Sequence, residues 1–146
     1  MEKKIQQALD DCVYFSVKKI DRQMDKIAEE AFRETGLAPT YNFILLILEQ
    51  CDHKNQREIA NMLHVAPSTI ARFVDKLQSK GYVSTESVGR QSFVSLTELG
   101  RQFTAEDVNN GWENLHVLCD AAIGHEDSST LNKHINATID HIKESR

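Results

Sequence analysis

Cysteine is scarce in this sequence and follows no recognisable pattern. The three cysteines, Cys12, Cys51 and Cys119, are odd in number and widely spaced, with no CxxC pair and no histidine at zinc-finger distance. A disulfide framework is therefore not expected. Each cysteine has apolar neighbours in the sequence, so we expect all three to be buried, reduced thiols.

The sequence also lacks a long hydrophobic run. Its most apolar stretch, YNFILLILEQC, meets Glu49, Gln50 and Asp52 well before the roughly 18 residues that a membrane span needs. The first residues, MEKKIQQALDDC, have neither the apolar core nor the small-residue cleavage site of a signal peptide. We therefore expect one compact unit of 146 residues that is cytoplasmic and has no membrane partner.

No motif for catalysis is present. The sequence contains no phosphate-binding glycine loop, no HExxH zinc motif and no serine or cysteine nucleophile elbow, so we expect neither an enzyme nor a cofactor. The six histidines are scattered. His134 and His141, two helical turns apart, are placed to approach a metal with Asp140 or Glu126, but solvated surface histidines are the simpler interpretation and we expect no metal site.

Glycine and proline are few, with six and two residues, and most of them stand where helical patterns end. Apolar residues at helical spacing predict one long amphipathic helix from Lys3 to about Arg33, closed by Gly36. Pro39 cannot continue that helix and suits the first turn of another. We therefore expect a short, almost wholly apolar helix over 40–50, buried in the centre of the fold.

Two short helices joined by a tight turn follow. Asn55 is an N-cap residue type and Glu58 stands three positions later, as in a capping box. The expected turn is 64–66, after which Pro67 begins a second helix that ends before Gly81. The apolar stripe that should hold this second helix to the core consists of Ile70, Phe73, Val74 and Leu77.

The hydrophobic period changes after Gly81. The segments YVSTES and SFVSLT alternate apolar and polar residues on either side of a glycine turn, which predicts a β-hairpin. Thr97 then opens a second long helix that Gly124 closes, and Asp127 with Ser128 should cap a final helix. The apolar face of that final helix is formed by Leu131, Ile135, Ile139 and Ile142.

Charge is unevenly distributed along this acidic chain. The sequence has 17 basic and 22 acidic residues, a net charge of −5, which argues against a protein that coats nucleic acid with its entire surface. Residues 54–80 nevertheless carry five basic and two acidic side chains, a net charge of +3. By contrast, residues 1–53 have a net charge of −3 and residues 104–146 a net charge of −5. A basic island therefore coincides with the two short helices.

The basic island has the residue types of a DNA-reading element. A short helix, a turn and a second helix with small polar residues at its start form the helix-turn-helix pattern. A helix that enters a major groove about 12 Å wide needs small leading side chains followed by long cations that reach base edges and phosphates. The β-hairpin that follows at once adds a wing, whose tip can contact the adjacent minor groove.

These segments resemble the multiple-antibiotic-resistance regulator (MarR) family of bacterial winged helix-turn-helix transcription factors over nearly the whole chain. The segments REIANML, PSTIARFVDKLQSKGYV and VSLTELG match the family's two short helices and the end of its wing. Among the more specific marks is Leu-Thr-x-x-Gly, at Leu96, Thr97 and Gly100. The resemblance implies a mainly α fold, a winged helix-turn-helix with a two-stranded β-wing and long N- and C-terminal dimerisation helices.

The same resemblance implies a transcriptional regulator that binds double-stranded DNA through a region at 37–103. We expect this regulator to be a repressor. The helix over 67–80 would be the recognition helix. The wing departs from the family pattern, because its tip is shorter and Val88 stands where an aspartate is usual, two residues before the wing-tip arginine. The DNA contacts that the resemblance implies are Pro67, Ser68, Thr69, Ala71, Arg72, Lys76 and Arg90.

A homodimer with intertwined first and last helices is a further implication, with a helical dimerisation region at 1–36 and 104–146. The long apolar stripes of those helices support it independently, since one winged domain cannot cover them. The resemblance also implies a small-molecule pocket where the two regions meet. For a hydrophobic effector we expect Tyr14, Tyr41, Trp112 and His116 as ligand-binding residues, although core packing would also explain these aromatic residues.

Two alternatives remain open at the level of sequence. Some members of the family sense peroxides through a cysteine in the first helix, a place that Cys12 occupies, but Tyr14 is too near in the helix to face it and stabilise a thiolate. A winged-helix adaptor that binds proteins and not DNA is compatible with the net acidity and the short wing. Salt-dependent binding to duplex DNA distinguishes this adaptor from a DNA-binding regulator.

Overall fold

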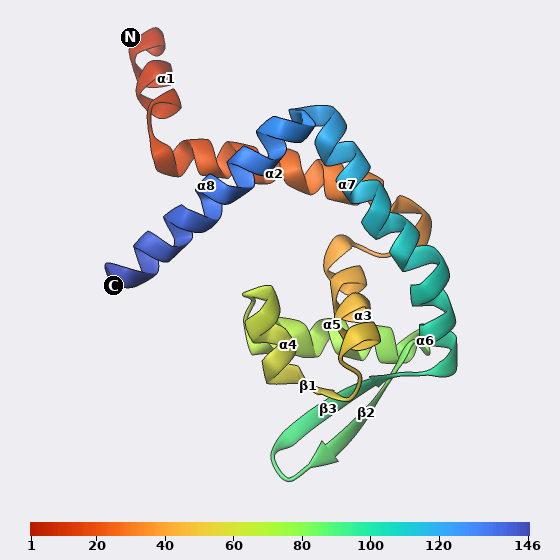
Figure 1. Ribbon diagram of the computed structural model, residues 1–146. Coiled ribbons are helices and arrows are strands. Elements are labelled where there is room, and N and C mark those ends of the chain that lie inside the picture. Colours follow the sequence, from red (N-terminus) through yellow and green to blue (C-terminus); the bar gives the residue numbers. More distant parts are fainter.

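The computed structural model describes all residues from Met1 to Arg146 as a helical chain with one small sheet at one end (Figure 1). The helical elements are α1 (Glu2–Asp10), α2 (Val13–Ala31), the 3-10 turn η1 (Arg33–Thr35), α3 (Pro39–Gln50), α4 (Gln56–Leu63), α5 (Pro67–Ser79), α6 (Glu98–Phe103), the π-helical turn η2 (Thr104–Val108), α7 (Asn109–Ile123) and α8 (His125–Glu144). The strands are β1 (Lys54–Asn55), β2 (Val83–Val88) and β3 (Gln91–Leu96). The predicted mainly α winged fold is confirmed. No helix combines the length and apolar character that crossing a membrane requires.

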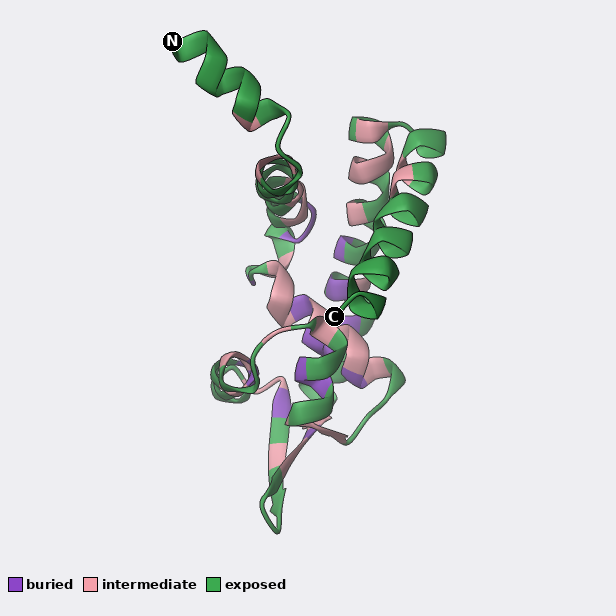
Figure 2. Ribbon diagram, turned by 90° about the vertical axis from the view of Figure 1, so that its left-hand side faces the viewer, coloured by how far each residue is buried: buried purple, intermediate pink, exposed green.

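The hydrophobic core lies in the winged part of the chain. Helix α3 runs through its centre, and Ile44, Leu45 and Leu48 are completely buried, as the apolar character of this segment predicts. Figure 2 shows the buried residues concentrated around α3 and the adjoining ends of α2 and α7, whereas α1 and α8 are exposed along their length. The other core residues include Ile59, Ile70, Val74, Leu77, Val83, Val94, Leu96 and Val108.

The helix-turn-helix forms where the sequence predicts it. The Asn55 side chain accepts a hydrogen bond of 2.8 Å from the Arg57 backbone N–H and caps α4. Glu58 does not complete a capping box, because its carboxylate pairs with the Lys54 ammonium at 3.2 Å. Helix α4 ends at His64, whose left-handed backbone (φ 57°) turns the chain toward α5.

The wing contains one strand more than the sequence indicates. Strands β2 and β3 pair antiparallel from Val83–Leu96 to Val88–Gln91, which confirms the predicted hairpin. The two-residue strand β1 pairs with the other edge of β3, so the strand order is β1-β3-β2. Two residues are too few to show a hydrophobic period, and this strand could not be read from the sequence.

A tightly packed junction ties the recognition helix to the wing and to α6. The Thr97 hydroxyl donates to the Gly81 carbonyl at 2.6 Å and accepts from the Gly100 N–H at 3.0 Å, while the Thr97 N–H donates to the Tyr82 carbonyl at 3.0 Å. A Cβ at Gly100 would lie only 1.9 Å from the Tyr82 carbonyl oxygen. We call these four residues, Gly81, Tyr82, Thr97 and Gly100, the wing–helix junction. It gives a physical reason for the threonine and glycine of the Leu-Thr-x-x-Gly motif.

The single long N-terminal helix predicted over Lys3–Arg33 is wrong in one respect. The chain breaks at Asp11 and Cys12, where Cys12 has an extended backbone (φ −88°, ψ 119°), so α1 projects away from the rest of the molecule (Figure 1). The Asp10 carboxylate spans the break and pairs with the Lys19 ammonium at 2.9 Å. Because neither glycine nor proline marks the break and the apolar spacing continues through it, the break could not be predicted from the sequence.

The C-terminal helices also differ from the prediction. The helix expected from Thr97 to Gly124 is interrupted by the π-helical turn η2, in which the Thr104 carbonyl accepts the Asn109 backbone N–H and also a 2.7 Å hydrogen bond from the Asn109 side chain. Helix α8 begins at His125, so Asp127 and Ser128 are not its cap. Gly124, with φ 98°, provides the sharp bend between α7 and α8.

The expectation of buried cysteines is not met. Cys12 and Cys51 are exposed and Cys119 is partly buried. Both exposed cysteines lie at helix boundaries, Cys12 before α2 and Cys51 after α3, where apolar sequence neighbours do not enclose them. Burial, together with the neighbouring Asp120 carboxylate, raises the pKa of the Cys119 thiol.

Replacement of Gly100 by alanine should destabilise the fold, because the new methyl group cannot fit against the Tyr82 carbonyl without moving backbone. We expect Gly100→Ala to lower the free energy of unfolding by roughly 1–3 kcal/mol, measured by urea denaturation. The control is Gln102→Ala, an exposed position on the same helix that should change stability by less than about 0.5 kcal/mol. Equal denaturation midpoints for the two variants would contradict this account of the junction.

Candidate DNA-binding surface

Helix α5 presents one polar face to solvent. Ser68, Arg72 and Lys76 are exposed and stand four residues apart, so they lie on one face of the helix. The opposite face is fixed in the core by Ile70, Val74 and Leu77, all completely buried. Of the other residues predicted to contact DNA, Pro67 is exposed at the start of the helix, and Thr69 and Ala71 are half-buried.

Neighbouring aromatic and backbone contacts hold α5 in place. The Phe73 ring packs edge-on against Tyr41 of α3 with 4.4 Å between the ring centroids. The C-terminal end of α5 runs into Gly81, whose positive φ of 84° reverses the chain into the wing–helix junction. The exposed face of α5 is therefore carried by a helix that is anchored along its length and at its end.

The cations on and beside this face have no carboxylate partners. Arg57, Arg72, Lys76 and Lys80 form no ion pair, whereas other basic residues of the region do. Lys54 pairs with Glu58, and Arg101 pairs with Asp52. The positive charge that is left uncompensated is therefore the charge displayed by the helix-turn-helix, which favours an anionic partner such as a phosphate backbone.

The tip of the wing places Arg90 in solvent. Gly89 has a positive φ of 62° and, with Arg90, makes the turn between β2 and β3. The Arg90 side chain is exposed and forms no hydrogen bond or ion pair. Val88 is 53% exposed and provides no polar group to hold the arginine, as its departure from the family pattern implies.

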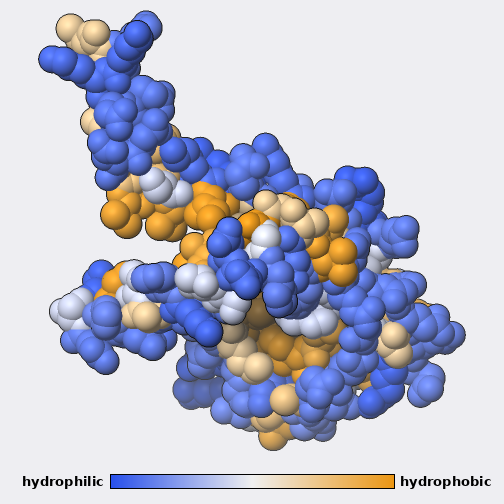
Figure 3. Space-filling model, turned by 45° about the horizontal axis from the view of Figure 1, so that its top comes forward, coloured by the Kyte–Doolittle hydropathy of each residue, from blue (hydrophilic) through white to orange (hydrophobic).

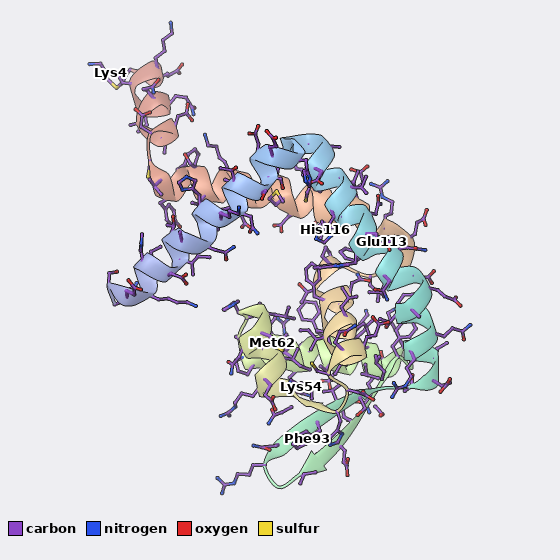
Figure 4. All side chains as sticks on the ribbon, viewed as in Figure 1. Lys4, Lys54, Met62, Phe93, Glu113 and His116 are labelled. Atoms are coloured by element: carbon purple, nitrogen blue, oxygen red, sulfur yellow. The ribbon has the colours of Figure 1, made fainter.

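The wing is braced at its base and not at its tip. The Asp52 carboxylate accepts a 3.1 Å hydrogen bond from the Leu96 N–H of β3 and pairs with the Arg101 guanidinium of α6. The His53 ring stacks on Phe93 with centroids 4.9 Å apart, on the strand that Figure 4 shows beside Lys54 of β1. Sequence reasoning missed this bracing, because Asp52 and Arg101 lie far apart in the chain and follow no local pattern.

The bracing sets the protonation behaviour of Asp52. Partial burial alone would raise the pKa of this carboxyl group, but the hydrogen bonds from Leu96, Arg101 and His53 outweigh burial and lower the pKa below its ordinary value. The carboxylate is thus stabilised in its charged form by groups from β3 and α6. Its negative charge is compensated within the wing base by the Arg101 guanidinium.

The four residues expected to bind an effector do not converge on one site. Trp112 and His116 of α7 are in contact, with ring centroids 4.6 Å apart, but Tyr41 packs on Phe73 and Tyr14 is 71% exposed on α2. Trp112 instead lines a cavity of about 480 Å³ between α3, α4 and α7. The residues that line it with Trp112 are Phe43, Leu46, Ile47, Glu49, Gln50, Leu63 and Asn109, which sequence reasoning did not select.

The remaining chemistry-bearing residues form no further cluster. The structure brings together no group of three His, Cys, Asp or Glu side chains that could hold a metal ion. His134 and His141 are both exposed on α8. Cys12, the residue considered for redox sensing, is exposed at the break between α1 and α2, and Tyr14 beside it contacts Lys18.

The central part of the chain matches a known protein family. The family model described as the DUF6293 C-terminal winged helix domain matches residues 23–105, more than half of the chain, from within α2 into η2. The chain belongs to this winged-helix family. The matched segment of the winged-helix domain includes α4, α5 and the whole wing, and hence every residue predicted to contact DNA. No curated protein matches the sequence.

Solved structures of bacterial regulators share the fold of this winged-helix protein over almost the whole chain. CouR from Rhodococcus jostii RHA1, bound to p-coumaroyl-CoA, is 24% identical, with a TM-score of 0.73 over 93% of this chain and 94% of that chain. A MarR-family regulator from Rhodococcus sp. RHA1 is 22% identical, with a TM-score of 0.74 over 90% and 93%. The Mycobacterium tuberculosis regulator MosR, in complex with DNA, is 20% identical, with a TM-score of 0.75 over 93% and 99%. At these identities the similarity establishes the fold, so the resemblance to the MarR family is confirmed at that level.

The bracing of the wing base by Asp52 predicts a specific loss of stability in acid. Because the pKa of Asp52 is lowered by folding, its stabilising effect is complete above the unfolded pKa of about 3.9 and disappears as the pH falls through the folded pKa. We expect wild type to be more stable than Asp52→Asn at pH 6, and the difference to shrink steadily below about pH 4. Unfolding midpoints measured against pH test this, and a difference that grows toward low pH would contradict it.

Proposed function

We propose that this protein is a sequence-specific DNA-binding transcriptional regulator, a repressor that binds a two-fold symmetric operator as a homodimer and is released by a small-molecule effector. The observation that carries the proposal is the exposed face of α5. Small side chains at its start are followed by Arg72 and Lys76, which have no partner in the protein, and the helix is anchored so that this face points outward. This is the arrangement that major-groove reading requires.

Similar structures support DNA binding and release by a ligand. MosR is described in complex with DNA, and CouR, described as a transcriptional repressor, is found both with a 23-mer DNA duplex and with p-coumaroyl-CoA. The present chain has the same fold, with the helix-turn-helix and wing in place. An adaptor that binds only proteins would have no need of four uncompensated cations around the reading helix, so the DNA-binding function is favoured over it.

Surface area supports the homodimer. The chain has an accessible surface of 10348 Å², whereas a compact monomer of 16.6 kDa would expose about 7,600 Å². The excess of about 2,800 Å² is larger than the roughly 800 Å² that each partner buries in a standard interface. The large hydrophobic side chains that remain exposed on the terminal helices include Ile5, Val13, Val17, Ile20, Val117, Ile135, Ile139 and Ile142.

These exposed apolar residues lie outside the winged part and so support a division of labour along the chain. Residues 1–36 and 104–146 would form the dimerisation region, and 37–103 the DNA-binding region. Figure 3 shows hydrophobic side chains gathered at the base of the projecting α1 arm, on a face that a second subunit would cover. Helices α1 and α8 have no fully buried residue within the chain, so much of their apolar surface is left for a partner.

The operator should contain two half-sites related by symmetry. Footprinting on genomic fragments captured by the purified protein should show two protected half-sites roughly 34–36 Å apart, one for each reading helix of the dimer. Ile139→Glu should convert the dimer to a monomer, measured by sedimentation, and abolish the paired footprint, while circular dichroism stays unchanged because Ile139 is outside the core. Ala137→Glu, on the opposite face of α8, is the matched control. Wild-type protection of a single half-site by a monomer would refute the proposal.

The reading helix and the wing should contribute differently to binding. We expect Arg72→Ala to cost roughly 1–3 kcal/mol of operator affinity and to relax sequence preference at one position in each half-site. Arg90→Ala should lower the slope of affinity against salt by at most about 1 and leave sequence preference unchanged, because an unbraced arginine makes a weak phosphate contact. Titration of operator and scrambled duplexes at several salt concentrations measures both effects. A greater loss of discrimination for Arg90→Ala than for Arg72→Ala would reverse these roles.

A further inference from the structure

The cavity beside Trp112 has an unusual combination of an apolar lining and a single charge. It lies between α3, the end of α4 and the start of α7, and its volume of about 480 Å³ falls in the range of small-molecule sites. Figure 3 shows a hollow with hydrophobic atoms in it on the face that carries the helical arms. Five of the eight lining residues are hydrophobic, namely Phe43, Leu46, Ile47, Leu63 and Trp112.

Glu49 is the charged residue of this lining, and it has no counter-ion. Its carboxylate is half-buried, and both of its oxygens accept from the Asn109 side-chain N–H group, at 3.1 and 3.0 Å. Neither a lysine nor an arginine lines the cavity or pairs with Glu49. The other carboxylate that links distant elements here, Asp52, has Arg101 as its partner. Glu49 therefore presents an uncompensated negative charge to whatever enters the cavity.

Trp112 adds a second feature that selects for positive charge. Its ring packs edge-on against Phe43 and His116, with centroid distances of 6.1 and 4.6 Å, and it lines the same cavity as Glu49. The face of an indole ring attracts cations more strongly than any other side-chain ring does. A carboxylate and a tryptophan in one apolar cavity are together complementary to an organic cation and unfavourable to an anion.

We propose that this cavity binds lipophilic cations, that is, aromatic or alkyl ammonium ions with the charge at Glu49 and the apolar body against Trp112 and Leu46. This proposal names the chemical class of the effector. Its effector role therefore rests on the proposed function. It differs from the chemistry of p-coumaroyl-CoA, the anionic molecule bound to CouR. A ligand of that charge would place its negative groups beside Glu49.

A hydrogen-bond relay connects the cavity to the segment that joins the two regions. The Asn109 side chain that holds Glu49 also donates to the Thr104 carbonyl at 2.7 Å, the same carbonyl that accepts the Asn109 backbone N–H in the π-helical turn η2. An ammonium ion at Glu49 competes with Asn109 for the carboxylate. Its binding therefore alters the hydrogen bonds that stabilise η2, between the wing–helix junction and α7, and couples the cavity to the orientation of α5.

Three probes that are similar in shape but differ in charge test the ligand class. We would titrate the full-length protein with 4-phenylbutylammonium, 4-phenylbutanol and 4-phenylbutyrate, and follow the fluorescence of Trp112, the one tryptophan of the chain. The cation should bind at least about tenfold more tightly than the anion, with the alcohol between them. Equal affinities, tighter binding of the anion, or binding of none of the three would overturn the proposal.

Two carboxylate variants locate the charge that is responsible. Glu49→Gln should reduce the affinity for the cation to that for the alcohol and leave the affinity for the alcohol unchanged. Glu113→Gln removes an exposed carboxylate on α7 outside this cavity and next to Trp112 in sequence (Figure 4), and it should change neither. Equal losses in the two variants would show that net charge and not the cavity attracts the cation, and would overturn the assignment to Glu49.

A separate measurement tests the effector role. Duplex captured from genomic fragments is titrated with wild type and Glu49→Gln in the presence of 4-phenylbutylammonium. Weakened binding for wild type alone supports the coupling through Asn109. Cation binding without any effect on DNA affinity would overturn the coupling but leave the ligand class standing. Failure to bind any duplex would refute the proposed function, while the fluorescence titration still decides the ligand class.

Discussion

The arrangement of this molecule depends on the close approach of Gly100 to the Tyr82 carbonyl. The Thr97 hydroxyl strengthens this contact, because it donates to the Gly81 carbonyl and accepts from the Gly100 N–H. The end of α5, the start of β2 and the start of α6 meet at this point. The reading helix and the wing are consequently fixed relative to each other. Because α6 continues through η2 into α7, the direction of the helical arms relative to α5 depends on the same few contacts.

Local signals explain which parts of the fold were predictable. The cap at Asn55, Pro67 at the start of α5 and the glycine turn of the wing each act within a few residues, so the helix-turn-helix and the hairpin were placed correctly. The break before Cys12 and the π-helical turn η2 lack glycine and proline and were missed. Both leave the apolar pattern intact, so only the packing of the folded chain reveals them.

The candidate site divides in the same way. The residues expected on the reading face of α5 lie on one helix, so the helical period was enough to group them. The pair of Asp52 and Arg101 and the cavity that joins Glu49 to Trp112 bring together residues from distant segments. Composition and spacing carry no information on such contacts. The four residues predicted to bind an effector, Tyr14, Tyr41, Trp112 and His116, accordingly do not converge on one site.

Positive and negative charge are distributed asymmetrically over the molecule. The unpaired cations lie on α5 and beside it, while residues 104–146 carry a net charge of −5 on η2, α7 and α8, which lead away from the wing. An approaching polyanion is attracted to one end of the molecule and repelled by the other, at distances up to about the 8–10 Å screening length of physiological salt. The acidic arms therefore help to orient the reading helix, even though they lower the total attraction.

The π-helical turn η2 sets the rotational phase of α7. A π-turn accommodates one residue more than an α-turn, and each residue of a helix turns its side chain by about 100° around the axis. Gly111, which allows the Phe32 ring to approach, and Trp112, which faces the cavity, both follow this extra residue. Deleting one residue from 104–108 would leave the sequence of α7 unchanged and yet turn both residues away from their present neighbours. In this stretch the number of residues is therefore constrained as strictly as their identity.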